Sequence, residues 1–143
     1  MMFPTRALLA TSGVALLAST GLSYAGAANA EGPPLHHVRY TVTANEPFFA
    51  DIYYREREPA VFADYSHDPY VFSPRARVDV GPDQPWVFDA MLADPALWAM
   101  VVVQSGESVG FPTPGFNCTL EVDGVVVKTD SGPSGALCSI RNW

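Results

Sequence analysis

The sequence predicts an exported all-β domain, an immunoglobulin-like β-sandwich of about seven strands with one disulfide. Three observations predict this fold. The first 30 residues have the pattern of a secretory signal. The rest of the chain consists of short apolar runs separated by turn residues. Two cysteines, Cys118 and Cys138, both lie in that later part, and an even count in an exported chain indicates a disulfide.

The N-terminal segment has the three parts of a secretory signal. Met1 to Arg6 carries one positive charge, Ala7 to Leu22 is uncharged and mostly apolar or small, and Ala28-Asn29-Ala30 matches the small-x-small cleavage pattern. We therefore expect cleavage near Ala30 and a secreted, periplasmic or cell-envelope location. An uncleaved anchor is the alternative, but a spanning helix needs about 20 predominantly apolar residues, and hydroxyl residues and glycines interrupt this run.

The remaining chain is long enough for one domain. We expect a signal over residues 1–30, a proline-containing spacer over 31–37 and the β-sandwich over 38–143. All 15 acidic residues lie after residue 30, with seven of the eight Lys and Arg. This acidic balance argues against nucleic acid as a partner, and against strong binding to anionic membranes, because both require clustered Lys and Arg.

Strands are predicted where β-branched and aromatic residues alternate with polar ones or form short apolar runs between turns. Ala96 to Met100 could instead start a helical turn after Asp94-Pro95, but the valines that follow favour a strand. Val61-Phe62 and Tyr70 to Phe72 are short apolar pieces in a polar stretch, without an assigned element. The predicted strands are Val38–Thr43, Phe49–Tyr54, Ala76–Val80, Trp86–Leu92, Trp98–Gln104, Phe116–Val122, Val125–Lys128 and Ala136–Ile140.

The last three strands constrain the disulfide. Asp123-Gly124 favours a two-residue type I′ hairpin, which pairs Val122 with Val125 and Cys118 with Thr129. A flat meander would then hold Cys118 and Cys138 about 9.5 Å apart, two strand spacings, beyond the limit of about 7 Å between Cα atoms. The last strand must therefore cross to the facing sheet. A closed loop of about 20 residues is worth roughly 3 kcal/mol in the chain-entropy model.

No catalytic or cofactor motif is recognisable in the sequence. It contains no G-x-S-x-G, no H-E-x-x-H and no glycine-rich phosphate loop. Asp64 to Asp68 gathers carboxylates and a histidine without the spacing of a known metal site, so a solvated loop is favoured over a metal site. Arg55 to Glu58 alternates in charge, which is typical of exposed ion pairs. We therefore predict no enzyme, no metal and no cofactor.

Two apolar features are candidates for an interaction surface. The loop Val109 to Phe116 is stiffened by two prolines, and either inserts into a partner or covers the end of the sandwich. Aromatic residues are also too numerous for one face of each strand, because neighbours in a strand alternate. Some are therefore exposed or covered by the segment Glu56 to Pro74. The candidate surface residues are Phe111, Pro112, Pro114, Phe116, Tyr65, Tyr70 and Phe72.

The C-terminal half contains three segments with a family pattern: Val101–Gln104, Cys118–Val125 and Gly135–Cys138. Further segments of the same pattern are Val38–Thr43, Ala50–Tyr54 and Pro85-Trp86. With these residues the chain resembles the MmpS family, the small accessory proteins of mycobacterial MmpL transporters. The resemblance implies an envelope β-sandwich with one disulfide that works beside an MmpL-type exporter of lipids or siderophores. Family members keep an N-terminal transmembrane helix, whereas this chain has a cleavable pattern.

Two functions follow as expectations. The first is an MmpS-like accessory or carrier module of the envelope, with an MmpL-type transporter or an apolar ligand as its partner. The alternative is a free-standing secreted binding module, a ligand carrier or inhibitor, that has no transporter partner.

Overall fold

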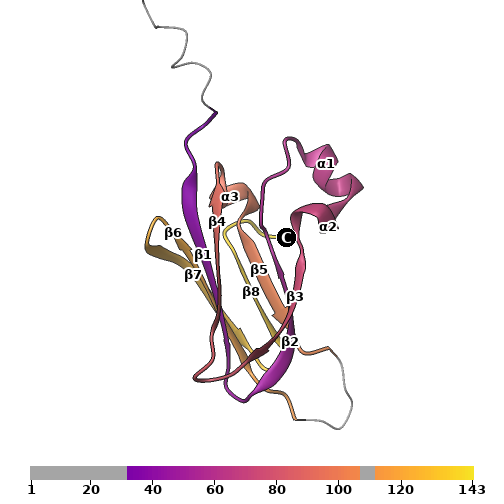
Figure 1. Ribbon diagram of the computed structural model, residues 1–143, viewed down its shortest axis with the longest axis vertical. Helices are drawn as coiled ribbons and strands as arrows, with labels where there is room; N and C mark the ends of the chain where they lie inside the picture. Colours follow the sequence, from indigo (N-terminus) through magenta and orange to yellow (C-terminus); the bar gives the residue numbers. More distant parts are fainter. Residues whose placement is uncertain (1–31, 107–111) are drawn as a thin grey trace, which may run out of the picture. The chain divides into compact units, whose positions relative to one another are not determined.

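The computed structural model describes residues 32–106 and 112–143, and within them eight strands form two four-stranded antiparallel sheets (Figure 1). One sheet has the order β4-β1-β6-β7 and the other β3-β2-β5-β8. The predicted all-β sandwich is confirmed. The strands are β1 His36–Ala44, β2 Phe48–Tyr54, β3 Arg75–Val80, β4 Trp86–Leu92, β5 Met100–Gln104, β6 Phe116–Val122, β7 Val125–Gly132 and β8 Gly135–Ser139.

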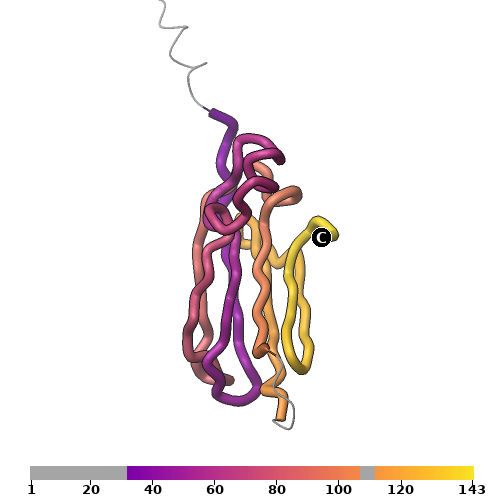
Figure 2. The backbone as a smooth tube through the Cα atoms, turned by 90° about the vertical axis from the view of Figure 1, so that its right-hand side faces the viewer, coloured from indigo at the N-terminus to yellow at the C-terminus, as the bar shows by residue number. Residues whose placement is uncertain are grey.

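The core lies between the two sheets, whose strands run along the long axis of the unit Pro33–Trp143 (Figure 2). Alternation along each strand builds it, because every second side chain points inward. On β1, for example, Val38, Tyr40 and Val42 are completely buried. Burial of each such side chain contributes about 1.5–3 kcal/mol relative to exposure.

Three short helices were not fully anticipated: α1 Phe62–His67, α2 Pro69–Phe72 and α3 Pro95–Trp98. The alternative helical turn after Asp94 is the correct one, since the Asp94 side chain accepts the Leu97 N–H at 3.2 Å and caps α3. β5 consequently begins at Met100 rather than Trp98. β1 begins at His36, two residues earlier than predicted.

The β6–β7 hairpin has the predicted turn. Asp123 and Gly124 both have positive φ, 50° and 81°, and Val122 pairs with Val125. The register then shifts between Leu120 and Glu121 because β7 has one extra residue there, Val127, in a β-bulge, so Cys118 pairs with Asp130 and not with Thr129 as predicted. The extra residue of a bulge moves every later pair by one position, and the sequence carries no signal for it.

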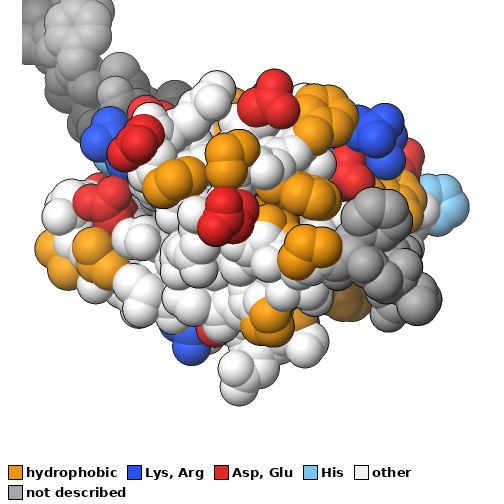
Figure 3. Space-filling model, turned by 90° about the horizontal axis from the view of Figure 1, so that it is seen from below, with side chains coloured by type: hydrophobic (Ala, Val, Ile, Leu, Met, Phe, Trp, Pro, Cys, Tyr) orange, Lys and Arg blue, Asp and Glu red, His pale blue; other side chains and the backbone are white. Residues whose placement is uncertain are grey.

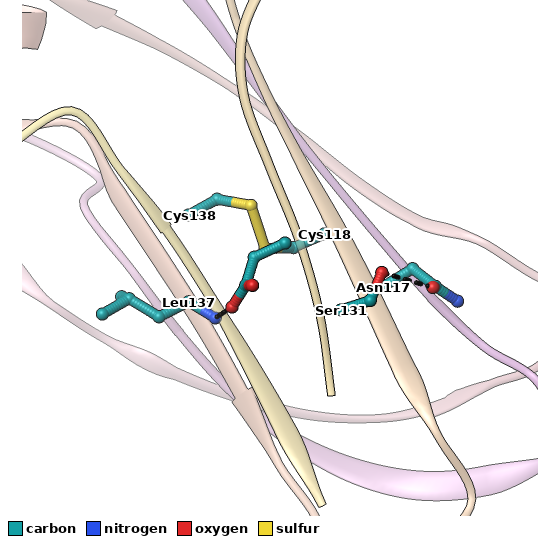
Figure 4. The surroundings of a disulfide bond; sticks show 6 residues. Asn117, Cys118, Ser131, Leu137 and Cys138 are labelled. Carbon is teal, nitrogen blue, oxygen red and sulfur yellow. Dashed lines mark hydrogen bonds between the residues drawn. A yellow bond between two sulfur atoms is a disulfide. The ribbon is translucent and has the colours of Figure 1, made fainter. Parts of the chain in front are cut away.

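The disulfide joins the two sheets, as predicted. Cys118 on β6 and Cys138 on β8 are bonded with their Cα atoms 6.1 Å apart (Figure 4). The chain crosses between the sheets in the turn Gly132–Gly135, where a Cβ on Gly132 would collide with the carbonyl oxygen of Gly135. The Asp130 side chain accepts the Leu137 N–H at 2.9 Å and fixes the crossing.

Candidate functional site

The connection between β2 and β3 forms a compact segment at one end of the sandwich. It contains α1 and α2, near α3 and the C-terminus (Figure 1). Neither helix has a buried residue, whereas Phe62, Tyr70 and Val71 are exposed, Tyr70 to 73%. We call residues 56–74 the α1–α2 segment. Aromatic and aliphatic side chains held in solvent in this way are typical of a binding surface.

A buried arginine lies beneath the α1–α2 segment. Arg55 has no exposed area. Its Nε donates to the carbonyl oxygen of Trp98 at 3.1 Å, and its Nη1 donates to Ser73 Oγ at 2.6 Å. Three rings surround the guanidinium, with centroids at 4.5 Å for Tyr65 and at 5.5 Å for both Trp98 and Trp143. Cation–π attraction of this kind is worth about 2 kcal/mol when the cation is desolvated.

The charge of Arg55 is not matched by a carboxylate. Within the described residues no acidic oxygen lies within 4.0 Å of its guanidinium, and its Nη2 has no hydrogen-bond partner. The Arg55 carbonyl oxygen accepts the hydroxyl of Tyr40 at 2.9 Å, and burial raises the pKa of that phenol, so it remains a donor. A buried, unpaired cation with an orphan donor is costly, and such groups are concentrated at functional sites.

The exposed ion pairs predicted for Arg55 to Glu58 are not formed. Arg55 is buried, Arg57 lies over the Phe72 ring with its guanidinium 5.4 Å from the centroid, and Glu58 accepts the Asp94 N–H. The alternating charges misled the prediction because the contacts of Arg55 come from aromatic residues far along the chain. No local pattern points to them.

A shallow pocket of about 390 Å³ lies on the β3 side of the α1–α2 segment. Tyr53, Tyr70, Ser73 and Arg75 contribute side chains with polar ends to its lining, together with Pro74. Ser73 connects the pocket to the buried guanidinium, because its hydroxyl is also the acceptor for Arg55. Sequence reasoning selected Tyr70 but missed Arg75 and Ser73.

The predicted loop surface is corrected in part. Phe111 lies outside the described residues. Pro112 is exposed, but Pro114 is buried and Phe116 is 1% exposed. The Phe116 ring packs edge-to-face on Phe48 with centroids 5.7 Å apart, because position 116 is an inward position of β6. Pro114 and Phe116 therefore belong to the interior and not to a contact surface.

Figure 3 views the molecule from below, and where described residues form this face, hydrophobic side chains are interspersed with polar ones and carboxylates. The predicted residues on the α1–α2 segment differ from those of the loop in their exposure. Tyr70 is exposed, and Tyr65 and Phe72 are half-buried with Tyr65 against Arg55. Unlike Pro114 and Phe116, these three residues therefore remain candidates for a contact surface.

For the stretch Asp64 to Asp68 the sequence favoured a solvated loop over a metal site. These residues form α1 and its C-terminal end, and Ser66 Oγ donates to the Ala63 carbonyl oxygen at 3.1 Å. In residues 32–106 and 112–143 no group of three or more His, Cys, Asp or Glu side chains is placed to hold a metal ion.

Two histidines at the start of β1 contact carboxylates on neighbouring strands. His36 Nδ1 lies 2.6 Å from Asp123, and His37 Nε2 lies 2.8 Å from Asp89, which Arg39 also contacts at 2.8 Å. The hydrogen bond from Arg39 is the main cause of a lowered pKa at Asp89, and that from His36 is the main cause at Asp123. These pairs connect β1 to β4 and to the β6–β7 turn.

Comparison with known proteins decides the family. The model of the Rv2576c β-sandwich domain matches residues 40–138, from β1 to the second cysteine. The chain belongs to this family. Uncharacterized proteins Rv2576c of Mycobacterium tuberculosis and Mb2606c of Mycobacterium bovis are each 36% identical to it over 135 residues, covering 92% of this chain and 86% of the relative.

The Rv2576c family description names a β-sandwich and assigns no activity. The family therefore agrees with the predicted fold, while the finer assignment to the MmpS proteins remains a prediction. In the part of the chain that the structure describes, no helix has both the length and the apolarity to cross a membrane.

Proposed function

We propose that this Rv2576c-family protein is an exported accessory or carrier module of the cell envelope, similar in role to MmpS proteins, that acts by binding and not by catalysis. Its partner is an MmpL-type transporter or an apolar ligand of such a transporter. The contact surface is the exposed side of the α1–α2 segment, centred on Phe62, Tyr70 and Val71.

One observation carries this proposal: the α1–α2 segment buries none of its helical residues and yet is held firmly in place. Tyr65 packs on Arg55 and Trp98, and Phe62 stacks on Trp98 with centroids 6.3 Å apart. A surface that is ordered before contact loses less entropy when it binds, and so retains more of its interaction energy as affinity. Exposed aromatic side chains are also the residues most often responsible for binding energy.

The proposal is tested by photo-cross-linking in a mycobacterial host. p-Benzoylphenylalanine replaces Tyr70 in the full chain, and the control places it at Val87, which is also exposed but lies on β4 of the other sheet. We expect an adduct with an MmpL-type transporter, or with envelope lipid, from position 70 and not from position 87.

The outcomes separate the two functions. A transporter adduct supports the accessory role, and an adduct with lipid alone supports the free-standing carrier. Equal labelling from both positions, or no adduct from position 70, contradicts a specific contact surface on the α1–α2 segment.

A further inference from the structure

Two arginines on β3 have the same orientation but different neighbours. Arg75 and Arg77 are two residues apart and both exposed. The register places Asp51 opposite Arg77, whose Nε lies 3.1 Å from Asp51 Oδ1. Tyr53 is opposite Arg75, and within the described residues no carboxylate lies within 4.0 Å of Arg75. Arg75 is therefore an unpaired cation on a chain of net charge −7.

The pocket beside Arg75 is suited to an anion. No carboxylate lines it. Ser73 Oγ accepts from Arg55 at 2.6 Å, which leaves the hydroxyl proton of Ser73 free to be donated to another acceptor. The buried, unpaired charge of Arg55 lies behind this hydroxyl and adds to the positive potential. The pocket thus offers the charge of Arg75 and hydroxyl donors to one ligand group, with the second positive charge, that of Arg55, buried behind it.

An apolar row leads away from Arg75 across the outer face of the sheet. Tyr53 pairs with Val102 on β5, and Val102 pairs with Leu137 on β8, all at the surface. With strands about 4.8 Å apart, the row from β3 to β8 is about 14 Å long. The adjacent row contains Arg77, Asp51 and Gln104 and is polar, which confines an apolar ligand to the first row.

We propose that this face binds a single-chain anionic amphiphile. Arg75 and Ser73 hold its carboxylate or phosphate group, and its alkyl chain lies across Tyr53, Val102 and Leu137. This inference rests on the proposed carrier function and names its ligand class. A cation next to an apolar row selects for both parts of such a molecule, since neither acetate nor an uncharged chain makes both contacts.

Isothermal titration calorimetry of the full chain, with its disulfide intact, tests the ligand class. The probes are decanoate below its critical micelle concentration, acetate as the head group alone, and decyl maltoside as an uncharged chain. We expect saturable binding of decanoate and much weaker binding of the other two. Equal affinity for decanoate and acetate would show an anion site without a site for the alkyl chain. Equal affinity for decanoate and decyl maltoside would show that Arg75 does not contribute to binding. Either result overturns the proposal, as does the absence of decanoate binding.

Matched variants test the residues. Arg75→Gln should weaken decanoate binding about 10-fold, as expected from loss of one charge-assisted hydrogen bond. Arg77→Gln removes the same charge two residues away and should change the affinity for decanoate less than about 2-fold. Leu137→Ser should also weaken binding, and Val87→Ser on the other sheet should not. Equal losses in Arg75→Gln and Arg77→Gln would mean non-specific attraction and would refute the site.

Thermal melting of each variant confirms that it is folded, and Arg75→Lys, which keeps the charge, should retain most of the affinity if Arg75→Gln is unstable. The ligand inference and the proposed function can fail separately. Decanoate binding depends only on the purified chain, whereas the adduct from position 70 depends on a partner in the envelope.

Discussion

The interior of the sandwich and the α1–α2 segment are stabilised by different interactions. The interior is a continuous set of aliphatic and aromatic side chains from both sheets, closed by the disulfide between β6 and β8. The α1–α2 segment contributes no fully buried helical residue and is held by aromatic and cation–π contacts, chiefly those of Tyr65 with the buried Arg55 and of Phe62 with Trp98. The interior therefore depends on apolar area, and the segment depends on a few contacts around one buried guanidinium.

Under the proposed function, folding and binding are carried by separate parts of the chain. Regular alternation encodes the sandwich, so most of its stability is independent of residues 56–74. The segment can present apolar side chains to a partner because the sandwich does not need them in its interior. Three predictions test how complete this separation is.

The largest effect is expected from removal of the disulfide. Replacing Cys118 and Cys138 together by Ala should lower the free energy of unfolding by about 3 kcal/mol, the value for a loop of about 20 residues in the chain-entropy model. Urea unfolding monitored by circular dichroism measures it. The control is Tyr70→Ala, which removes an exposed ring and should change stability by less than about 0.5 kcal/mol. A loss in Tyr70→Ala comparable to that in the double Ala variant would show that the two parts are not separable.

A smaller effect is expected from Arg55. Arg55→Ala should lower the free energy of unfolding by about 2 kcal/mol, because it removes cation–π contacts with three rings and leaves a cavity among them. The near-ultraviolet circular dichroism of Trp98 and Trp143 should change with it. Arg55→Lys keeps the charge but not the planar donor group, and should restore less than half of the loss. Unchanged stability and an unchanged spectrum in Arg55→Ala would contradict the structural role of this residue.

The smallest effect is expected from the carboxylates at the start of β1. The pKa values of Asp89 and Asp123 are lowered from the ordinary value of 3.8 by hydrogen bonds from Arg39 and His36. A carboxyl whose pKa is lowered in the folded state stabilises the protein at pH values above its ordinary pKa. This contribution is lost as the pH falls through the pKa of the folded state. Stability attributable to these carboxylates should therefore be constant from pH 7 to about 5 and decline below about 4.

Asp89→Asn and Asp123→Asn should each flatten the decline in stability below pH 4, when urea unfolding is followed at several pH values in that range. Because both carboxylates are exposed, high salt should reduce the difference between variant and parent. A decline of the same steepness in the variants would place the acid-sensitive groups elsewhere.

Most of the sandwich could be predicted from the sequence because its strands alternate. Trp86–Leu92 and Phe116–Val122 have the predicted bounds, and the Asp123-Gly124 turn has the predicted pairing. The position of the disulfide between the sheets followed from distances alone. The bulge in β7 was missed because it adds one residue without changing the local composition.

The candidate site was harder to predict because its contacts are distant along the chain. Arg55 contacts Tyr65, Trp98 and Trp143, and no pattern in the residues next to it in the sequence predicts these contacts. Arg75 and Arg77 are indistinguishable in sequence, and only the register with β2 shows that Asp51 neutralises the second of them.

The position of β1 has a consequence for the order of folding. β1 is an inner strand of its sheet, and both of its neighbours come much later in the chain: Val38 pairs with Ala90 on β4 and with Val122 on β6. A chain that emerges from its N-terminal end therefore leaves β1 without its partner on β6 until residue 122 has followed. Such distant pairing slows folding. The first strand of the sandwich is thus paired on both edges only late in synthesis, and a chaperone that shields β1 in that interval should increase the yield of native protein.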